Sequence, residues 1–204
     1  WEAIHFFWGD ERHAPPDDAE SNFGAAHEDL LSRVPVSPAN VHRIRGEFAE
    51  ASRAAEDYEK LLREFFKLEA GQFPRFDLAL LGLGADGHTA SLFPGTGALR
   101  EQSRLVVANW VERLKTERIT LTAPVLNNAA NVIFLVQGED KAQALKAVIN
   151  GPYQPDVLPA QMIQPAHGSL LWLLDMRAAR LLVSGEAQPS RARRRAPRAR
   201  RGSP

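Results

Sequence analysis

A chain of 204 residues with no cysteine forms neither a disulfide nor a catalytic thiolate. Its 25 basic and 25 acidic residues balance, and a hydrophobic content of 44% is that of a soluble globular protein, which excludes a disordered chain. No apolar run approaches the ~20 residues of a membrane helix, and no secretory signal is visible. The six histidines include no H-x-x-x-H pair, which argues against a structural zinc site. We expect a cytoplasmic protein without cofactor or metal.

The balanced charge conceals two unequal parts of the chain. From position 184 onward, seven arginines against one acid give a charge of +6, and 18 bases against 24 acids give the preceding residues −6. An acidic body with an arginine- and proline-rich end is typical of a folded domain and a disordered extension. The sequence therefore predicts one α/β domain over residues 1–183 and a disordered tail over 184–204. We do not expect a nucleic-acid partner, and the tail is the only part of the chain that suits one.

The first expected elements are a strand over residues 3–8 and a helix that begins after Ser21 or Asn22. A short extended piece at 41–44 and a long amphipathic helix from about 48 to 66 follow. The first strand ends in Gly-Asp-Glu-Arg, at positions 9–12. Three successive charges usually form a solvated loop, but the carboxyl end of a strand is also where an α/β sheet binds ligands.

The most informative stretch is 76–94, which reads FDLALLGLGADGHTASLFP. Residues 76–81 form a nearly continuous apolar run, typical of a parallel strand buried on both faces. The glycines at 82 and 84 allow a tight turn close to a ligand. Asp86, His88 and two hydroxyl residues then occupy the place where the strand ends and a helix can begin. This combination indicates a reaction centre.

Two plainer interpretations of the turn were weighed. Residues 82–87 spell G-x-G-x-x-G, but the dinucleotide fingerprint needs an uninterrupted helix and an acid about 20 positions on. Here Pro94 and its neighbouring glycines break any helix, and the next expected strand, 105–108, ends in Asn109. Nicotinamide binding is therefore disfavoured. The other interpretation, in which Asp86 caps a helix and His88 is a satisfied polar residue, suits most isolated Asp-Gly pairs.

The rest of the chain continues to alternate between strands and helices. Strands are expected at 105–108, 119–122, 131–136 and 169–174, and helices after Pro124 and at 140–150 and 176–182. This alternation predicts an α/β fold with a mainly parallel sheet and helices on both faces. His167 lies in a proline-flanked loop, and we expect it to be structural.

As a whole string, residues 76–94 resemble the signature of the 6-phosphogluconolactonases. The related glucosamine-6-phosphate deaminases share the Gly-x-Asp-Gly-His core, but continue with Asn-Glu-Pro where this chain has Thr-Ala-Ser-Leu-Phe-Pro. Residues 8–12 are similar to a second lactonase motif, and the deaminases tend to carry an aromatic residue in place of Arg12. Residues 115–122 resemble a third motif, whose basic residues lie near the substrate phosphate. The resemblance implies the three-layer α/β architecture of the sugar-phosphate isomerase and deaminase superfamily.

The resemblance also implies an activity, the hydrolysis of 6-phosphoglucono-1,5-lactone to 6-phosphogluconate in the oxidative pentose phosphate pathway. Such a reaction needs a base for water, donors for the developing oxyanion and cations for the phosphate. His88 is the expected base, since imidazole titrates near neutrality, and Asp86 is expected to orient the site or the substrate hydroxyls. Arg113 is a further candidate for phosphate binding. The residues expected to bind substrate are Arg12, Gly84, Gly87, Lys115 and Arg118.

Two alternatives stay open. An isomerase or deaminase of the same superfamily would use Asp86 to shuttle a proton between sugar carbons, and a deaminase would release ammonia instead of acid. A binding protein that recruits nucleic acid through the arginine tail would show a steep salt dependence. The chain also departs from the family pattern, because the Ser-Gly-Gly phosphate loop of an earlier strand–turn–helix is not found in it. We therefore expect the N-terminal part of the domain to be missing and the phosphate site to lack one wall.

Overall fold

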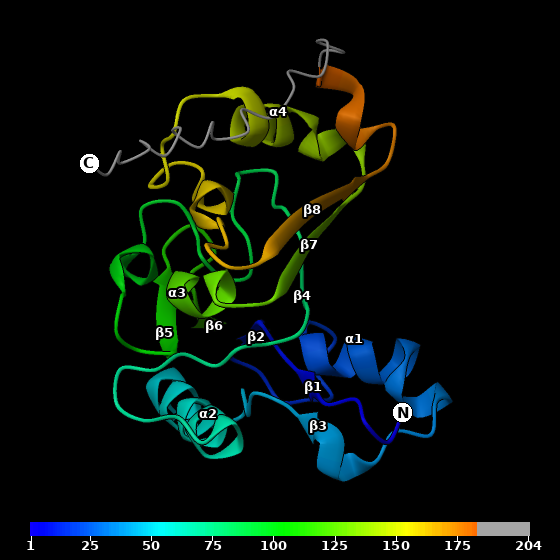
Figure 1. The fold of residues 1–204 in the computed structure, drawn as a ribbon, viewed down its shortest axis with the longest axis vertical. Coiled ribbons are helices and arrows are strands. Elements are labelled where there is room, and N and C mark those ends of the chain that lie inside the picture. Colours follow the sequence, from blue (N-terminus) through cyan, green and yellow to red (C-terminus); the bar gives the residue numbers. More distant parts are fainter. Residues whose placement is uncertain (183–204) are drawn as a thin grey trace, which may run out of the picture.

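The computed structural model describes residues 1–182, which form three small β-sheets and the helices that surround them (Figure 1). The tail expected over 184–204 lies outside the described residues, so its disorder stays a prediction. Two of the sheets are parallel and one is antiparallel. The parallel sheets contain β1 (Phe6–Phe7) with β3 (Val41–His42), and β4 (Ala79–Leu81) with β7 (Asn131–Val136) and β8 (Ser169–Leu174). The antiparallel sheet contains β2 (Asp10–Arg12), β6 (Thr116–Leu121) and β5 (Val106–Val111).

Within residues 1–182, four α-helices and several short 3-10 helices connect these strands. The α-helices are α1 (Asn22–Asp29), α2 (Ala51–Phe66), α3 (Ala123–Asn127) and α4 (Ala142–Asn150). Shorter 3-10 turns lie at Leu31–Arg33, Pro38–Asn40, Gly97–Arg100, Glu139–Lys141, Pro159–Met162 and Ala178–Leu181. Elements α1, β1 and β3 lie at one end of the molecule and α4 at the other (Figure 1). No helix within residues 1–182 combines the length and apolarity needed to cross a bilayer.

The predicted α/β architecture is confirmed, and several elements match closely. The strands expected at 131–136 and 169–174 have these same bounds, and Ser21 caps α1 by accepting from the Gly24 N–H at 3.0 Å. The first strand is reduced to Phe6–Phe7, and the last expected helix is only a 3-10 turn. The antiparallel sheet was not predicted, because the pairing of β5 with β6 and β2 depends on contacts between distant segments.

The expectation that residues 76–81 are buried on both faces is wrong for the described part of the chain. Leu81 is 5% exposed, whereas Leu80, on the opposite face of β4, is 59% exposed. The same alternation continues across β7 and β8, where one face joins the core and the other carries the exposed side chains Leu135, Leu171 and Leu173. A strand with a continuous apolar sequence thus need not be buried on both faces, since hydrophobicity alone does not show which elements pack against it.

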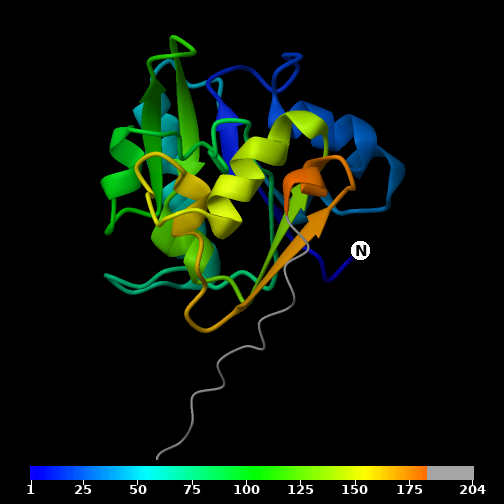
Figure 2. The ribbon, with the colours of Figure 1, turned by 90° about the horizontal axis from the view of Figure 1, so that it is seen from above.

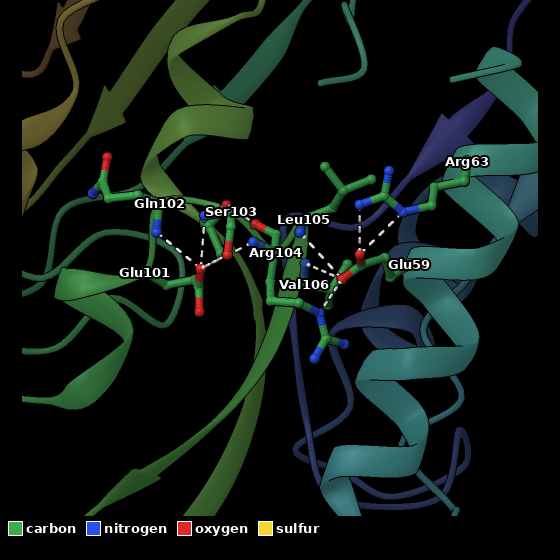
Figure 3. Close-up of polar contacts among 9 residues, drawn as sticks. Glu59, Arg63, Glu101, Gln102, Ser103, Arg104, Leu105 and Val106 are labelled. Atoms are coloured by element: carbon green, nitrogen blue, oxygen red, sulfur yellow. Dashed lines mark hydrogen bonds and ion pairs between the residues drawn. The ribbon is translucent and has the colours of Figure 1, made fainter. Parts of the chain in front are cut away.

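A buried carboxylate ties α2 to the start of β5 (Figure 3). Glu59 is 7% exposed and accepts hydrogen bonds from Arg63 and Arg104, each at 2.8 Å, and from the Leu105 N–H at 3.2 Å. Burial raises the pKa of Glu59, but the hydrogen bonds from the two guanidinium groups outweigh it and the net shift is downward. Folding therefore favours the ionised form of Glu59.

A second carboxylate organises the loop that leads into β5 (Figure 3). Glu101 accepts from the backbone N–H groups of Gln102, Ser103 and Arg104 at 2.7–2.9 Å. The backbone hydrogen bond from Arg104, followed by those from Ser103, lowers the pKa of Glu101 to about 2. Glu101 therefore fixes the conformation of the loop that precedes β5.

We predict that Glu59→Gln lowers the free energy of unfolding at pH 7 by roughly 1.5–3 kcal/mol, because two guanidinium groups lose a charged acceptor. The pKa of Glu59 falls on folding, so its contribution is complete above the unfolded value of ~4.3 and is lost as the pH falls through the folded value. Urea unfolding at pH 7 and pH 4 should therefore show a smaller acid-induced loss of stability in the variant than in the wild type.

The matched control is Glu64→Gln on the same helix, where the carboxylate is 68% exposed and lies 3.8 Å from Lys60. That change should leave the free energy of unfolding within about 0.5 kcal/mol of the wild type. Equal effects of the two substitutions would show that Glu59 does not tie α2 to β5.

Candidate active site

A cleft of about 320 Å³ lies where strands of different sheets end. Its wall comes from three segments that are distant in the sequence: 9–22, 80–90 and Lys141. The second segment follows the carboxyl end of β4 and the third follows that of its parallel neighbour β7. The cleft thus occupies the position at which open α/β sheets bind ligands.

An acid and an imidazole are held together at this cleft. The Nδ1 atom of His88 lies 2.5 Å from Oδ1 of Asp86, and the His88 backbone N–H donates to the same oxygen at 3.2 Å. The imidazole also stacks on Phe93, with ring centroids 4.2 Å apart. Two hydrogen bonds and one ring face therefore fix the orientation of His88, which lines the cleft.

The ionisation of Asp86 determines which ring nitrogen carries the proton. Burial raises the pKa of Asp86, but the hydrogen bonds from His88 and the nearby charges of His88 and Arg113 outweigh it and lower the value to about 2. An ionised carboxylate accepts hydrogen bonds and donates none, so Nδ1 of His88 must carry the proton. In the neutral ring, Nε2 is then the basic nitrogen.

Two glycines make room for this pair. A Cβ atom at Gly84 would overlap Nδ1 and Cε1 of His88 and would lie 2.7 Å from Oδ1 of Asp86. Gly87 has a φ of +82°, in the left-handed region that favours glycine, and faces Leu158. The N–H groups of both glycines donate within the turn, Gly84 to the His88 carbonyl at 2.9 Å and Gly87 to the Gly84 carbonyl at 3.0 Å.

No regular helix follows this turn, in agreement with the helix-breaking residues at 94–97. Residues 82–94 make successive turns, including a short bridge between Thr89 and Leu92, before the 3-10 turn at Gly97–Arg100. Pro94 and the tight turn at Ala90, which has a φ of +47°, are incompatible with a regular helix there. Donors aimed by a helix N-terminus are therefore not part of this site.

Two of the predicted substrate-binding arginines lie side by side. Arg12 of β2 lines the cleft and is the cross-strand partner of Arg118 of β6. Arg118 is 9% exposed, and burial, followed by the charge of Arg12, lowers its pKa. Within residues 1–182 its ion pair with Glu20 spans 4.0 Å, and the Nη1 atom of Arg12 donates to the Glu20 carbonyl. Two adjacent guanidinium groups, one of which lines the cleft, provide donors that suit a bound anion.

The structure does not bring Lys115 to the cleft wall. Lys115 lies in the turn between β5 and β6, with its side chain 71% exposed and its ammonium group paired with Glu112. Arg113, in the same turn, instead reaches the acid of the pair, and its Nη2 atom lies 2.7 Å from Oδ2 of Asp86. The two cations of this turn therefore have different surroundings.

Sequence reasoning missed several polar residues of the site. Asp10 is a half-buried cleft residue whose Oδ2 accepts from the Ser91 hydroxyl at 2.7 Å and whose carbonyl accepts from Asn22 at 3.0 Å. Burial raises the pKa of Asp10 despite the hydrogen bond from Ser91. Lys141 enters the cleft from beyond β7. Both positions carried a usable signal, since each is a charged residue that follows the carboxyl end of a predicted strand.

Comparisons with known proteins add independent information. Residues 1–172 match the model of a family described as glucosamine-6-phosphate isomerases/6-phosphogluconolactonase. A 6-phosphogluconolactonase of Synechocystis sp. is 45% identical over 178 residues, which cover 87% of this chain and 73% of the relative. The crystal structure of the devB protein has a TM-score of 0.81 at 40% identity, covering 88% of this chain and 74% of that one. The 6-phosphogluconolactonase of Trypanosoma brucei has a TM-score of 0.77 at 32% identity, with 88% and 74% covered.

We predict that Gly84→Ala separates His88 from Asp86, because the added methyl group overlaps the imidazole. Overpacking of this kind costs about 1–3 kcal/mol, which corresponds to a fall in melting temperature of at least about 2 °C. A crystal structure of the variant should show the Nδ1–Oδ1 distance lengthened beyond hydrogen-bond range. Gly97→Ala is the control, since a Cβ there meets nothing within 4 Å. An unchanged Asp86–His88 distance in Gly84→Ala would contradict the assigned role.

Proposed function

Since the chain belongs to the glucosamine-6-phosphate isomerase/6-phosphogluconolactonase family, we propose that it hydrolyses 6-phospho-D-glucono-1,5-lactone to 6-phospho-D-gluconate with Nε2 of His88 as general base. Its relatives are named 6-phosphogluconolactonase, and the chain is accordingly an enzyme of the carboxylic ester hydrolase class that acts in the oxidative pentose phosphate pathway. The observation that carries the assignment of the base is the Asp86–His88 pair, joined at 2.5 Å beside a cleft that also contains Arg12 and Lys141.

The proposed reaction uses His88 twice. Water attacks the lactone carbonyl carbon, and Nε2 of His88 takes a proton from that water as the new C–O bond forms. The resulting imidazolium is stabilised by the ionised Asp86, which accepts from Nδ1. When the bond between the carbonyl carbon and the ring oxygen breaks, the imidazolium returns the proton to that oxygen. The products are the carboxylic acid, which ionises in water, and the hydroxyl group of the opened sugar.

Positive charge in and beside the cleft suits the phosphate group of such a substrate. Arg12 and Lys141 line the cleft, and Arg118 lies beside Arg12 on the neighbouring strand. A guanidinium group binds phosphate bidentately, which gives geometry as well as charge. The role of Lys115 in phosphate binding stays a prediction, because its ammonium group could contact the phosphate only if the turn between β5 and β6 brought it nearer to the cleft. Together these cations are the proposed phosphate site.

The polar wall formed by Asp10, Asn22 and Ser91 is proposed to face the sugar hydroxyls. Asp10 already accepts from the other two side chains, so the three form one hydrogen-bonded group. Gly84 and Gly87 are proposed to act by keeping the turn close to the substrate, since their N–H groups are used within the turn. A cytoplasmic location and the absence of a nucleic-acid partner stay predictions from composition.

We predict that His88→Ala lowers kcat by roughly 10²- to 10⁴-fold, because water then loses its general base. Acid release from the phosphorylated lactone at pH 7, corrected for spontaneous hydrolysis, measures this loss. His167→Ala is the control, since His167 is an exposed loop residue that accepts a hydrogen bond from Arg75 through its backbone carbonyl. Turnover at the wild-type rate in His88→Ala would remove His88 from the mechanism while leaving the family assignment intact.

We predict that Arg12→Ala and Lys141→Ala each raise KM for the phosphorylated lactone by about tenfold, the effect of one charge-assisted contact of ~1.4 kcal/mol. Both variants should hydrolyse unphosphorylated glucono-1,5-lactone like the wild type, because that substrate lacks the anion. Steady-state kinetics with the two lactones provides the comparison. Equal losses on both would mean that these residues contact the lactone ring or support the fold.

A further inference from the structure

The turn between β5 and β6 places an arginine on the carboxylate that holds His88. The Nη2 atom of Arg113 lies 2.7 Å from Oδ2 of Asp86, whose other oxygen accepts from His88 at 2.5 Å. Asp86 is thus held at both oxygens, by the imidazole on one side and by a residue 27 positions along the chain on the other. A carboxylate fixed in this way cannot rotate about its Cβ–Cγ bond without losing a contact.

The turn that carries Arg113 is itself well supported. Strands β5 and β6 pair over six residues each, from Val106 opposite Leu121 to Val111 opposite Thr116, and the hairpin extends from the body of the molecule (Figure 2). Within the turn, Glu112 accepts from the Trp110 indole N–H at 2.7 Å and pairs with Lys115. The other charged residues of the turn are therefore engaged with one another, and Arg113 extends toward Asp86.

We propose that Arg113 is a positioning residue for the hydrolysis, whose guanidinium group holds Asp86 in the orientation that accepts from Nδ1 of His88. This inference rests on the proposed function, and it deepens the assignment of the catalytic pair. The positive charge of Arg113 also favours the ionised carboxylate, which keeps the imidazole proton on Nδ1 and Nε2 basic. Asp10, Arg12 and Lys141 face the same cleft and stay unchanged in the tests below.

Positioning fits the contacts of Arg113 better than phosphate binding. Its guanidinium group is already joined to Asp86, and Arg113 is not among the residues that line the cleft, whereas Arg12 and Lys141 are. Its side chain is 64% exposed, so its removal takes little apolar surface out of the core. A change of activity in an Arg113 variant therefore reports on the site and not on unfolding.

Steady-state kinetics of Arg113→Ala tests the proposal. An exposed ion pair of up to ~1 kcal/mol predicts a kcat lowered about two- to fivefold, with KM unchanged and the same factor on glucono-1,5-lactone. Arg113→Lys should restore most of the rate, and Arg53→Ala, which removes an exposed arginine paired with Glu56 on α2, should have no effect. In an Asp86→Asn background, Arg113→Ala should cause no further loss. An effect on KM for the phosphorylated lactone alone, or an undiminished loss in that background, would overturn the proposal.

Proton NMR of the ligand-free enzyme gives a readout that does not require activity. The Nδ1 proton of His88, assigned by its loss in His88→Ala, should give a hydrogen-bonded, slowly exchanging signal in the wild type and in Arg113→Lys. In Arg113→Ala it should exchange faster with water. An equal exchange rate in wild type and Arg113→Ala, or no such signal in the wild type, would contradict the positioning role. A wild type without lactonase activity would overturn the proposed function, while this signal would still decide the role of Arg113.

Discussion

The hydrogen bond between Asp86 and His88 is the contact on which the rest of the site depends, and three features of the chain serve it. Gly84 leaves the space that the imidazole occupies, Phe93 supports the face of the ring, and Arg113 holds the second carboxylate oxygen. Because Asp86 is ionised, the bond also fixes the tautomer of His88. A local turn of a few residues thus fixes both the orientation and the tautomer of the proposed base, His88.

The charged residues around this pair divide into a group suited to phosphate binding and a group at the catalytic turn. Arg12 and Arg118 lie together on adjacent antiparallel strands beside the cleft, which suits a bound phosphate. Asp10, on the same strand as Arg12, is half-buried and accepts a hydrogen bond from Ser91, in the segment that follows the catalytic turn. The antiparallel sheet, which sequence patterns did not predict, is therefore the element that carries the cations to the turn after β4.

The sequence predicted those parts of the site that depend on neighbouring residues. Asp86, His88 and Gly84 lie within five positions, so their geometry is largely local and could be inferred from the turn itself. Lys141 follows the carboxyl end of a predicted strand, but its place in this cleft depends on β7 lying beside β4, which a sequence pattern does not show. The contact of Arg113 with Asp86 likewise depends on the register of a hairpin. The exposure of Leu80 shows that prediction of the fold has the same limit, since a hydrophobic pattern does not identify the element that packs on it.

The most direct test of the account is the tautomer of His88, measured by nitrogen-15 NMR of the ligand-free enzyme at a pH where the imidazole is neutral. The account predicts a protonated Nδ1, which donates to Asp86, and an unprotonated Nε2. A neutral ring with its proton on Nε2 would contradict it, because that nitrogen would then have no lone pair with which to take a proton from water.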